Sequence, residues 1–362
     1  MAHRLKNITV RGFKSIGDAT LSLNNLNILI GPNGAGKSNF ISLFNFLRHL
    51  VEQRLQISVR EAGGAERLLH YGSKTTPSIF VQLEFPPNYY RVSLQPSEDD
   101  NLFIESEQIG FHNVQQYKYV YWSTVATGVL ESKLITAAKS NHVPEYVYGV
   151  LKNWRVYHFH DTSASAGVKK TGKINDNLYL REDASNLAAF LYLMREEAPK
   201  HYERIVRTIQ LVIPMFRDFL LRPDPFNMDT IRLEWHDRNS DYIFGASELS
   251  DGSLRFICIT TMLLQPKRPD LILLDEPELG LHPAAVQVLA GLIKKVSELA
   301  QLIVSTQSVA LISAFNPEDI IVVEHHEKNT SFERLEEAPL HAWLQEYSLG
   351  ELWEKNVIGG RP

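Results

Sequence analysis

Gly31-Pro32-Asn33-Gly34-Ala35-Gly36-Lys37-Ser38 is the stretch that decides the fold. The apolar run of residues 28–30 before it predicts a buried strand, and residues 39–50 after it repeat apolar side chains at helical spacing. A strand, a glycine-rich loop and a helix in this order predict a phosphate loop, whose backbone N–H groups surround phosphates. Lys37 reaches the outer phosphates, and the Ser38 hydroxyl is placed to bind Mg²⁺. We therefore expect ATP to bind at Gly31, Pro32, Asn33, Gly34, Ala35, Gly36, Lys37, Ser38 and Asn39.

A second motif, Asp275-Glu276, follows the apolar run of residues 271–274, which predicts a strand buried on both faces of a parallel sheet. Asp275 would hold the water shell of Mg²⁺. Glu276 is placed to orient and deprotonate an attacking water, because phosphoryl transfer depends mainly on positioning and needs one fixed carboxylate as its base. The alternative is an acidic turn that caps the next helix.

A third motif, Leu249-Ser250-Asp251-Gly252-Ser253, predicts the start of a helix with Ser250 as its N-cap. Gly252 lets a ligand approach the backbone closely, and the positive end of the helix dipole attracts anions. We expect Ser250 and Gly252 to contact a phosphate. A plain helix start is the alternative interpretation.

In their order along the chain (31–38, then 249–253, then 275–276) the motifs resemble those of the ABC-type ATPases of the SMC and RecF group, and the chain is similar to compact bacterial AAA-type proteins with ABC-like sites. The resemblance covers essentially the whole chain. It rests on RGFKSI (residues 11–16), GPNGAGKSNF (31–40), LSDGS (249–253), LLDEPELGLHP (273–283) and VSTQS (304–308). Three further stretches are typical of the subgroup: AGGAERLLHYGS (62–73), YHFHDTS (157–163) and YSLGELW (347–353).

In that family two protomers enclose two ATP molecules. The resemblance implies that Ser250 and Gly252 of one protomer contact the γ-phosphate bound by the other, and that residues 278–283 lie along the dimer seam. It therefore implies an ATP-dependent homodimer with two-fold symmetry. It also places the turn of residues 13–15 near the nucleotide base, where Phe13 either stacks on adenine or belongs to the core.

The chain departs from transporter-type relatives at Gln307, which stands where those proteins usually have a histidine that contacts the γ-phosphate. The expected catalytic residues are thus Glu276, Lys37 and Gln307. An amide can donate a hydrogen bond to a phosphate but carries no charge, so we expect slow ATP hydrolysis. The glutamine that normally senses Mg²⁺ is not placed by the sequence, and Gln53, Gln56 and Gln82 are candidates by position only.

Composition sets the outer bounds. The chain has 362 residues, of which 44% are apolar, enough for one large or two medium domains with real cores. A net charge of −5 excludes a bulk polycation, so any contact with DNA must be a local patch. The single cysteine, Cys258, excludes an internal disulfide framework and fits a reducing cytosol. We expect a cytoplasmic protein without a signal peptide or a membrane span.

The expected fold is α/β: an ABC-type P-loop NTPase core with a mixed sheet and an inserted, mostly helical lobe. We expect the first half of the core at residues 1–96, the insert at 97–239, and the second half at 240–362. The second half contains the motifs at residues 249–253 and 275–276 and the residues of the expected dimer seam, 278–283. Strands are expected at residues 5–10 and 20–23, and a hairpin at 79–94 around Pro86-Pro87. Helices are expected at 185–195 and 201–219. The insert has no sustained heptads, which argues against a long coiled coil.

Two features of the insert are weighed against simpler interpretations. Lys169, Lys170 and Lys173 lie in a loop that contains Gly and Ser, and a solvated surface loop is favoured over a contact with a phosphate backbone. His158 and His160 would share one face of a strand. Ordinary hydrogen-bonded histidines are favoured over a metal site, because no further ligands follow at a convincing spacing.

The resemblance implies an ATPase that acts on DNA, in repair or in anti-phage defence, together with a separate nuclease or other effector protein. The alternative is a nucleotide switch that binds a partner protein and regulates it without DNA. A transporter ATPase is disfavoured by the helical insert, by Gln307 and by the RGFKSI motif.

Overall fold

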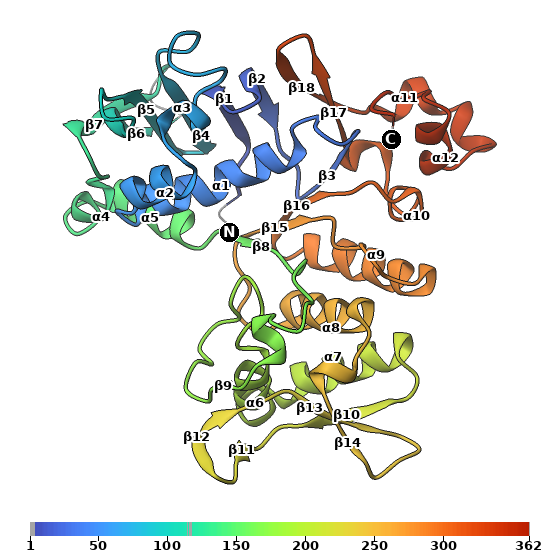
Figure 1. Ribbon diagram of the computed structural model, residues 1–362. Coiled ribbons are helices and arrows are strands. Elements are labelled where there is room, and N and C mark those ends of the chain that lie inside the picture. Colours follow the sequence, from blue (N-terminus) through green and yellow to red (C-terminus); the bar gives the residue numbers. More distant parts are fainter. Residues whose placement is uncertain (1–3, 114, 116–117, 362) are drawn as a thin grey trace. The chain divides into compact units, whose positions relative to one another are not determined.

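The computed structural model describes residues 4–113, 115 and 118–361 (Figure 1). The chain packs into two compact units, each treated separately below. Unit 1 comprises Met1–Val156, Pro269–Leu273 and Ala300–Pro362, and unit 2 comprises Tyr157–Arg268 and Leu274–Leu299. The structure therefore divides the chain after residue 156, whereas the sequence predicted an insert from residue 97.

A sheet with strand order β18-β17-β3-β16-β15-β8 carries the phosphate loop at the end of β3. β3 runs parallel to both β16 and β17, with Ile28 opposite Val304 and Ile320. All five residues of β3 are buried, which confirms the buried strand predicted before the loop. The strands are β3 (Leu26–Ile30), β8 (Arg155–Tyr157), β15 (Leu271–Asp275), β16 (Gln301–Ser305), β17 (Ile320–His326) and β18 (Asn329–Arg334).

The second large sheet of unit 1 is antiparallel, with strand order β2-β1-β4-β5-β6-β7. Its strands are β1 (Asn7–Phe13), β2 (Ile16–Ser22), β4 (Ile79–Phe85), β5 (Asn88–Pro96), β6 (Leu102–Phe111) and β7 (Tyr121–Val129). The hairpin of β4 and β5 turns at Pro86-Pro87, as predicted. Because β6 and β7 extend this sheet, the start of the expected insert belongs structurally to unit 1.

The core of unit 1 is built on α1 (Lys37–Val51), whose apolar face contacts side chains from both sheets in one buried cluster. Phe44 of α1 packs against Trp154 with ring centroids 5.1 Å apart. The predicted helix after the phosphate loop is thus confirmed. The other helices of unit 1 are α2 (Leu55–Glu61), α3 (Ala65–Leu68), α4 (Leu134–Ala137), α5 (His142–Lys152), α10 (Val309–Ile312), η3 (Pro317–Asp319), α11 (Glu337–Leu340), η4 (Trp343–Gln345) and α12 (Leu349–Glu354).

Unit 2 combines helices with small sheets. α8 (Asp251–Leu264) packs against α7 (Pro199–Val212) and α9 (Pro283–Ser297), as Figure 1 shows. The remaining elements are η1 (Gly167–Lys169), α6 (Leu187–Glu197) and η2 (Ala246–Glu248), together with strands β9 (Gly172–Lys173), β10 (Phe216–Leu220), β11 (Pro223–Asp224), β12 (Asn227–Ile231), β13 (Glu234–Asp237) and β14 (Ile243–Gly245). The strands form two sheets with orders β10-β13-β14 and β11-β12-β9.

The helix predicted at residues 201–219 is wrong in its second half. α7 ends at Val212, and residues 216–220 form β10. Pro214 disfavours the helical conformation of Ile213 and has no N–H for a helical hydrogen bond. The apolar residues after it, Phe216 and Phe219, pack in the small sheet instead, where Phe216 stacks on Trp235. The helix predicted at 185–195 is confirmed as α6, shifted by two residues.

Among the described residues, no helix combines the length and the apolar character needed to cross a membrane.

Candidate functional site

The phosphate loop joins β3 to α1 with glycines in conformations that other residues rarely adopt. Gly31, Gly34 and Gly36 have φ values of 152°, 81° and 113°. A Cβ at Gly31 would overlap the carbonyl oxygen of Val323, whereas at Gly34 nothing lies within 4 Å. The loop is thus packed tightly on its sheet side and open at Gly34, where an anion can approach the backbone.

The first turn of α1 is suited to an anion. Gly36 is the N-cap and provides no capping side chain, and the first turn contains no acidic residue among the described positions. The N–H groups at a helix start and the helix dipole attract negative charge. Ser38 is exposed at this end of the helix, where its hydroxyl can reach a metal ion that accompanies a phosphate.

Lys37 is folded back over the loop. Lys37 is only 5% exposed, and its Nζ donates hydrogen bonds to the carbonyl oxygens of Gly31 (2.6 Å) and Pro32 (3.0 Å). A buried ammonium group is costly unless it is hydrogen-bonded, and these carbonyls stabilise it. The ammonium group is therefore already held beside the loop that would bind phosphate.

Gln307 contacts the same loop. It follows β16, whose five residues are all buried, and its Nε2 donates a hydrogen bond of 2.6 Å to Oδ1 of Asn33. Its neighbour Ser308 caps α10 through a hydrogen bond from the Leu311 N–H. Gln307 therefore contacts the phosphate loop directly, through Asn33.

The turn of the RGFKSI motif is hydrogen-bonded to residues around the phosphate loop. The Oγ of Ser15 accepts hydrogen bonds from Asn39 Nδ2 (2.9 Å) and from Thr330 Oγ1 (2.9 Å). Thr330 also contacts the carbonyl oxygen of Ala35 at 3.0 Å. Thr330 was missed in the sequence because it lies almost 300 residues from the loop and carries no motif signal. Phe13 is fully buried and packs against Phe46, with ring centroids 5.6 Å apart, so it belongs to the core.

In unit 2, β15 ends at Asp275 and the chain turns sharply at Glu276. Glu276 has a φ of 43°, in the left-handed region that non-glycine residues seldom adopt, and it precedes Pro277. Backbone strain of this kind costs about 1–3 kcal/mol and is concentrated at functional sites. Both carboxylates are half-buried and line a small hollow with Tyr157, Phe159, His160, Arg255, Ile259, Leu274 and Pro277.

His158 lies close enough to Asp275 for their charges to interact. Burial lowers the pKa of His158, the Asp275 carboxylate raises it, and His160 lowers it again. The rings of His158 and His160 are 6.5 Å apart between centroids. Over the part of the chain that the structure describes, no three His, Cys, Asp or Glu side chains come together as a metal-binding group.

The Ser250 motif begins α8 as predicted. Ser250 is the N-cap, and its Oγ accepts a hydrogen bond from the Ser253 N–H at 3.2 Å. A Cβ at Gly252 would overlap the carbonyl oxygen of Gly280. Gly252 therefore has a role inside its own chain, because it lets the start of α8 pack directly on the turn of residues 278–281.

The remaining candidates have other environments. Lys169 is largely buried, and its Nζ lies 3.7 Å from Asp251 and 2.5 Å from the carbonyl oxygen of Thr162, so it is not a solvated loop residue.

Gln53 donates to the Ser132 carbonyl, Gln56 to those of Leu102 and Leu130, and Gln82 to the Glu84 carboxylate. These contacts do not identify any of the three glutamines as a Mg²⁺ sensor.

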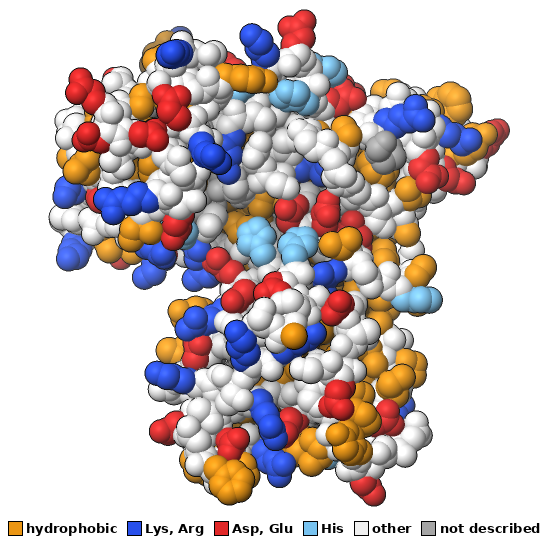
Figure 2. Space-filling view, in the orientation of Figure 1, with side chains coloured by type: hydrophobic (Ala, Val, Ile, Leu, Met, Phe, Trp, Pro, Cys, Tyr) orange, Lys and Arg blue, Asp and Glu red, His pale blue; other side chains and the backbone are white. Residues whose placement is uncertain are grey.

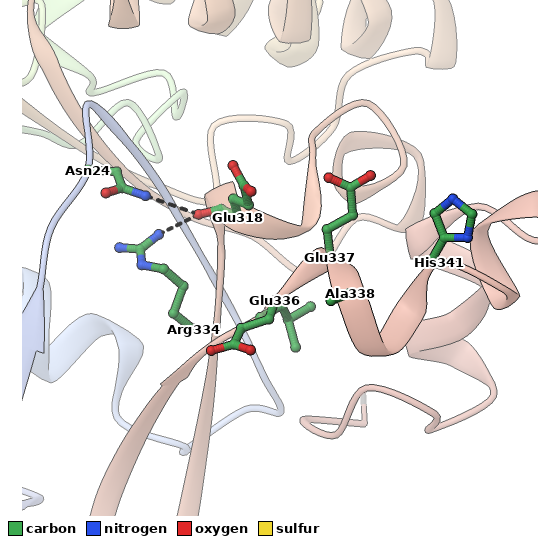
Figure 3. A pocket seen from close by; sticks show the side chains of 8 residues that line it. Asn24, Glu318, Arg334, Glu336, Glu337, Ala338 and His341 are labelled. Carbon is green, nitrogen blue, oxygen red and sulfur yellow. Dashed lines mark hydrogen bonds between the residues drawn. The ribbon is translucent and has the colours of Figure 1, made fainter.

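A larger hollow of about 890 Å³ in unit 1 contains none of the expected site residues (Figure 3). Its lining includes Asn24, Glu318, Glu336, Glu337 and His341. Arg334 and Asn24 both donate to the carbonyl oxygen of Glu318, at 2.7 and 3.3 Å, and Arg334 also donates to Asn27 Oδ1. The guanidinium group of Arg334 therefore connects β18 to Asn27 in β3 and to Glu318 in η3.

The expected site residues divide between the two units. Residues 31–39 and Gln307 belong to unit 1, whereas Ser250, Gly252, Asp275 and Glu276 belong to unit 2. Within unit 1 the structure brings Gln307 to the phosphate loop, and within unit 2 it brings Gly252 to the turn after Glu276.

The fold is that of an ABC-type P-loop NTPase core. Two solved structures share this fold. One is an Smc head bound to the C-winged helix domain of ScpA, with a TM-score of 0.58 at 15% identity. The other is an Smc head with an extended coiled coil bound to the C-terminal domain of ScpA, derived from Pyrococcus furiosus, with a TM-score of 0.55 at 14% identity. The first match covers 92% of this chain and 99% of the other, and the second covers 94% and 98%.

The chain belongs to the family described as "AAA domain, putative AbiEii toxin, Type IV TA system", which matches residues 26–313. A curated relative, urease accessory protein 2 of Cryptococcus neoformans var. grubii, is 38% identical over 86 residues. That match spans 22% of this chain and 7% of the relative. The family and the fold together confirm the resemblance drawn from the motifs.

Proposed function

We propose that this protein is an ATPase that binds ATP with Mg²⁺ at the phosphate loop and dimerises around the nucleotide. The observation that carries the proposal is the loop itself. A buried lysine ammonium group is held over glycine-rich backbone that is open at Gly34, at a helix start without a capping side chain. This combination fits a polyphosphate, because it offers N–H groups, helix dipole and a cation in one place.

Each expected residue has a role in this proposal. Residues 31–39 hold the phosphates, with Lys37 neutralising their charge and Gln307 contacting the outermost one. Ser38 and Asp275 provide oxygen ligands of the kind that Mg²⁺ prefers, and the ion would neutralise charge on the phosphate oxygens. Glu276 orients the attacking water and accepts its proton. The strained backbone at Glu276 supports this role, since strain of this kind is concentrated at functional sites.

The proposed dimer is symmetric. Ser250 and Gly252 of one protomer would contact the γ-phosphate held by the other, and residues 278–283 would lie along the seam. The start of α8 supports this, because its N-cap is exposed and its helix dipole favours an anion. We also propose that residues 1–96 and 240–362 form the ATPase core and residues 97–239 its insert, and that the protein is cytoplasmic.

The biological setting we propose is DNA repair or anti-phage defence, with a separate nuclease or effector protein. The family description names a putative toxin of a toxin–antitoxin system, and both Smc heads were solved with a ScpA domain bound. Figure 2 shows basic and acidic side chains interspersed over the face in view, without a single basic stripe. On this face, any DNA contact would therefore be local. The alternative, a nucleotide switch that regulates a partner protein without DNA, is favoured by those protein-bound heads.

ATP hydrolysis with and without double-stranded DNA tests the proposal, with Glu276→Gln as the inactive reference. We expect a slow Mg²⁺-dependent rate in the wild type and a rate reduced at least about a hundredfold in the variant, because the proposed base is lost. Stimulation by DNA that disappears at higher salt supports the DNA-linked function. A rate that DNA does not change favours the protein-binding switch. Wild-type hydrolysis in Glu276→Gln would contradict the assignment of the base.

A further inference from the structure

Arg255 of α8 joins three segments of unit 2 that are distant in sequence. The residue is only 6% exposed. Its Nε donates to the carbonyl oxygen of Phe159 at 2.9 Å, its Nη2 to that of His160 at 3.2 Å, and its Nη1 to that of Leu279. One guanidinium group thus connects the helix that begins with Ser250, the segment of residues 159–160 and the turn of residues 278–281.

The chemistry of this bridge requires an arginine. Burial lowers the pKa of Arg255, while the Asp251 carboxylate and Cys258 raise it. A buried charge is costly unless it is hydrogen-bonded, and here three backbone carbonyls accept the hydrogen bonds. The guanidinium fork presents several donors in a fixed plane, whereas a lysine ammonium is a compact charge that cannot reach three carbonyls in different directions.

The turn of residues 278–281 packs against both the start of α8 and the guanidinium group of Arg255. A Cβ at Gly252 would overlap the carbonyl oxygen of Gly280. Gly280 has a φ of 76°, and a Cβ on it would lie 3.2 Å from Nη1 of Arg255. The turn therefore contacts both the first residues of α8 and the guanidinium group, with no room for a side chain at Gly252 and a tight contact for one at Gly280.

Lys169 provides a second bridge to the same end of α8. Its side chain is 9% exposed, its Nζ donates to the Thr162 carbonyl at 2.5 Å, and it lies 3.7 Å from Asp251. The stretch of residues 159–162 is thus attached to α8 through Arg255 on one side and Lys169 on the other. Neither the Ser250 motif nor the Asp275-Glu276 motif includes this stretch.

We propose that Arg255 is a positioning residue for the dimer. It holds the phosphate-contacting start of α8, the turn of residues 278–281 and residues 159–162 as one rigid body. This inference rests on the proposed function, in which Ser250 and Gly252 contact the γ-phosphate of the other protomer. Without the guanidinium group, the turn and the start of α8 lose their common anchor, and the dimer weakens although each phosphate loop still binds ATP.

Arg255→Lys tests this role in a Glu276→Gln background, which retains bound ATP. Arg268→Lys is the matched control. Among the described residues, the one hydrogen bond that Arg268 donates goes to the carbonyl oxygen of Leu263, at the other end of α8. Binding of a fluorescent ATP analogue to the monomer and the dimer dissociation constant from sedimentation are measured for each protein. We expect Arg255→Lys to weaken the dimer at least about tenfold, equal to about 1.4 kcal/mol, and to change monomer ATP affinity less than about twofold. Arg268→Lys should match the parent in both.

Hydrogen exchange of the nucleotide-free monomer separates positioning from unfolding. Faster exchange confined to residues 159–162 and 278–281 supports the inference, and hydrolysis by Arg255→Lys with Glu276 intact should recover as protein concentration rises. Unchanged dimerisation overturns the inference, as does a defect that concentration does not rescue in a folded protein. Exchange that rises throughout α8 and α9 also overturns it, since Arg255 would then be a general stability residue. A Glu276→Gln parent that binds ATP without dimerising contradicts the proposed function itself, and the inference with it.

Discussion

At the level of single residues, the expected site depends on backbone conformations that few amino acids tolerate. Gly31 and Gly36 adopt φ values of 152° and 113° where a side chain would overlap neighbouring atoms, whereas Glu276 adopts a φ of 43° despite its side chain. Glycine at position 276 would relieve the strain, yet the chain has a carboxylate there. This contrast supports a chemical role for Glu276.

Lys37→Ala should abolish useful ATP affinity. The substitution removes a charge-assisted contact to the phosphates worth about 3 kcal/mol, so binding of a fluorescent ATP analogue should weaken by about a hundredfold or more. Lys6→Ala, at an exposed lysine before β1 in the same unit, is the control and should bind like the wild type. Near-normal affinity in Lys37→Ala would mean that Lys37 does not face the phosphates.

At the level of elements, the start of α8 shows how a motif residue can serve packing as well as a ligand. The sequence assigned Gly252 to close approach of a phosphate. The structure adds that the same position contacts Gly280 in the turn before α9. The ends of these helices are set by nearby residues in the chain. Ser250 caps the start of α8, and Pro214 follows the end of α7. The packing of α8 on the turn is visible only in the folded chain.

Gly252→Ala and Gly291→Ala should therefore shift stability in opposite directions. At position 252 the new Cβ overlaps backbone, and overpacking of this kind costs about 1–3 kcal/mol. At position 291, inside α9, nothing lies within 4 Å of the new Cβ, and alanine is favoured over glycine in a helix by about 0.5–1 kcal/mol. Urea unfolding of each variant gives the comparison. Equal effects at the two positions would refute the packing role of Gly252.

At the level of the whole molecule, single substitutions can test the proposed ATP-dependent dimer. Ser250→Arg should prevent ATP-dependent dimerisation, because a bulky cation would occupy the exposed start of α8 where a phosphate is expected to bind. Monomer binding of ATP should remain, since residues 31–39 belong to unit 1. Sedimentation of the Glu276→Gln background with and without Ser250→Arg provides the measurement.

Ser240→Arg is the control for this experiment, because Ser240 is exposed in the loop between β13 and β14 of unit 2 and its replacement adds the same charge. The control should still dimerise with ATP. Should Ser250→Arg also form a normal ATP-bound dimer, the shared-site arrangement would be refuted, while the phosphate loop and its ATP binding would stand.

The sequence by itself determined the phosphate loop, the buried strand before it and the helix after it, together with the class of protein. These features depend on residues that are neighbours in the chain, so their spacing is set by covalent geometry. The N-cap at Ser250 and the hairpin at Pro86-Pro87 were predictable for the same reason. The end of α7 was missed although Pro214 is local, because the apolar residues beyond it continued an apparently helical pattern.

Only the tertiary structure decided which distant residues support the loop and the start of α8. Thr330 reaches the Ala35 carbonyl across 295 positions, and Arg255 reaches the Phe159 carbonyl across 96. It also decided that β6 and β7 extend the antiparallel sheet of unit 1. Such contacts arise from the packing of whole sheets and helices and from the hydrogen bonds that buried polar groups require. No local pattern in the chain specifies which partner a buried donor will find.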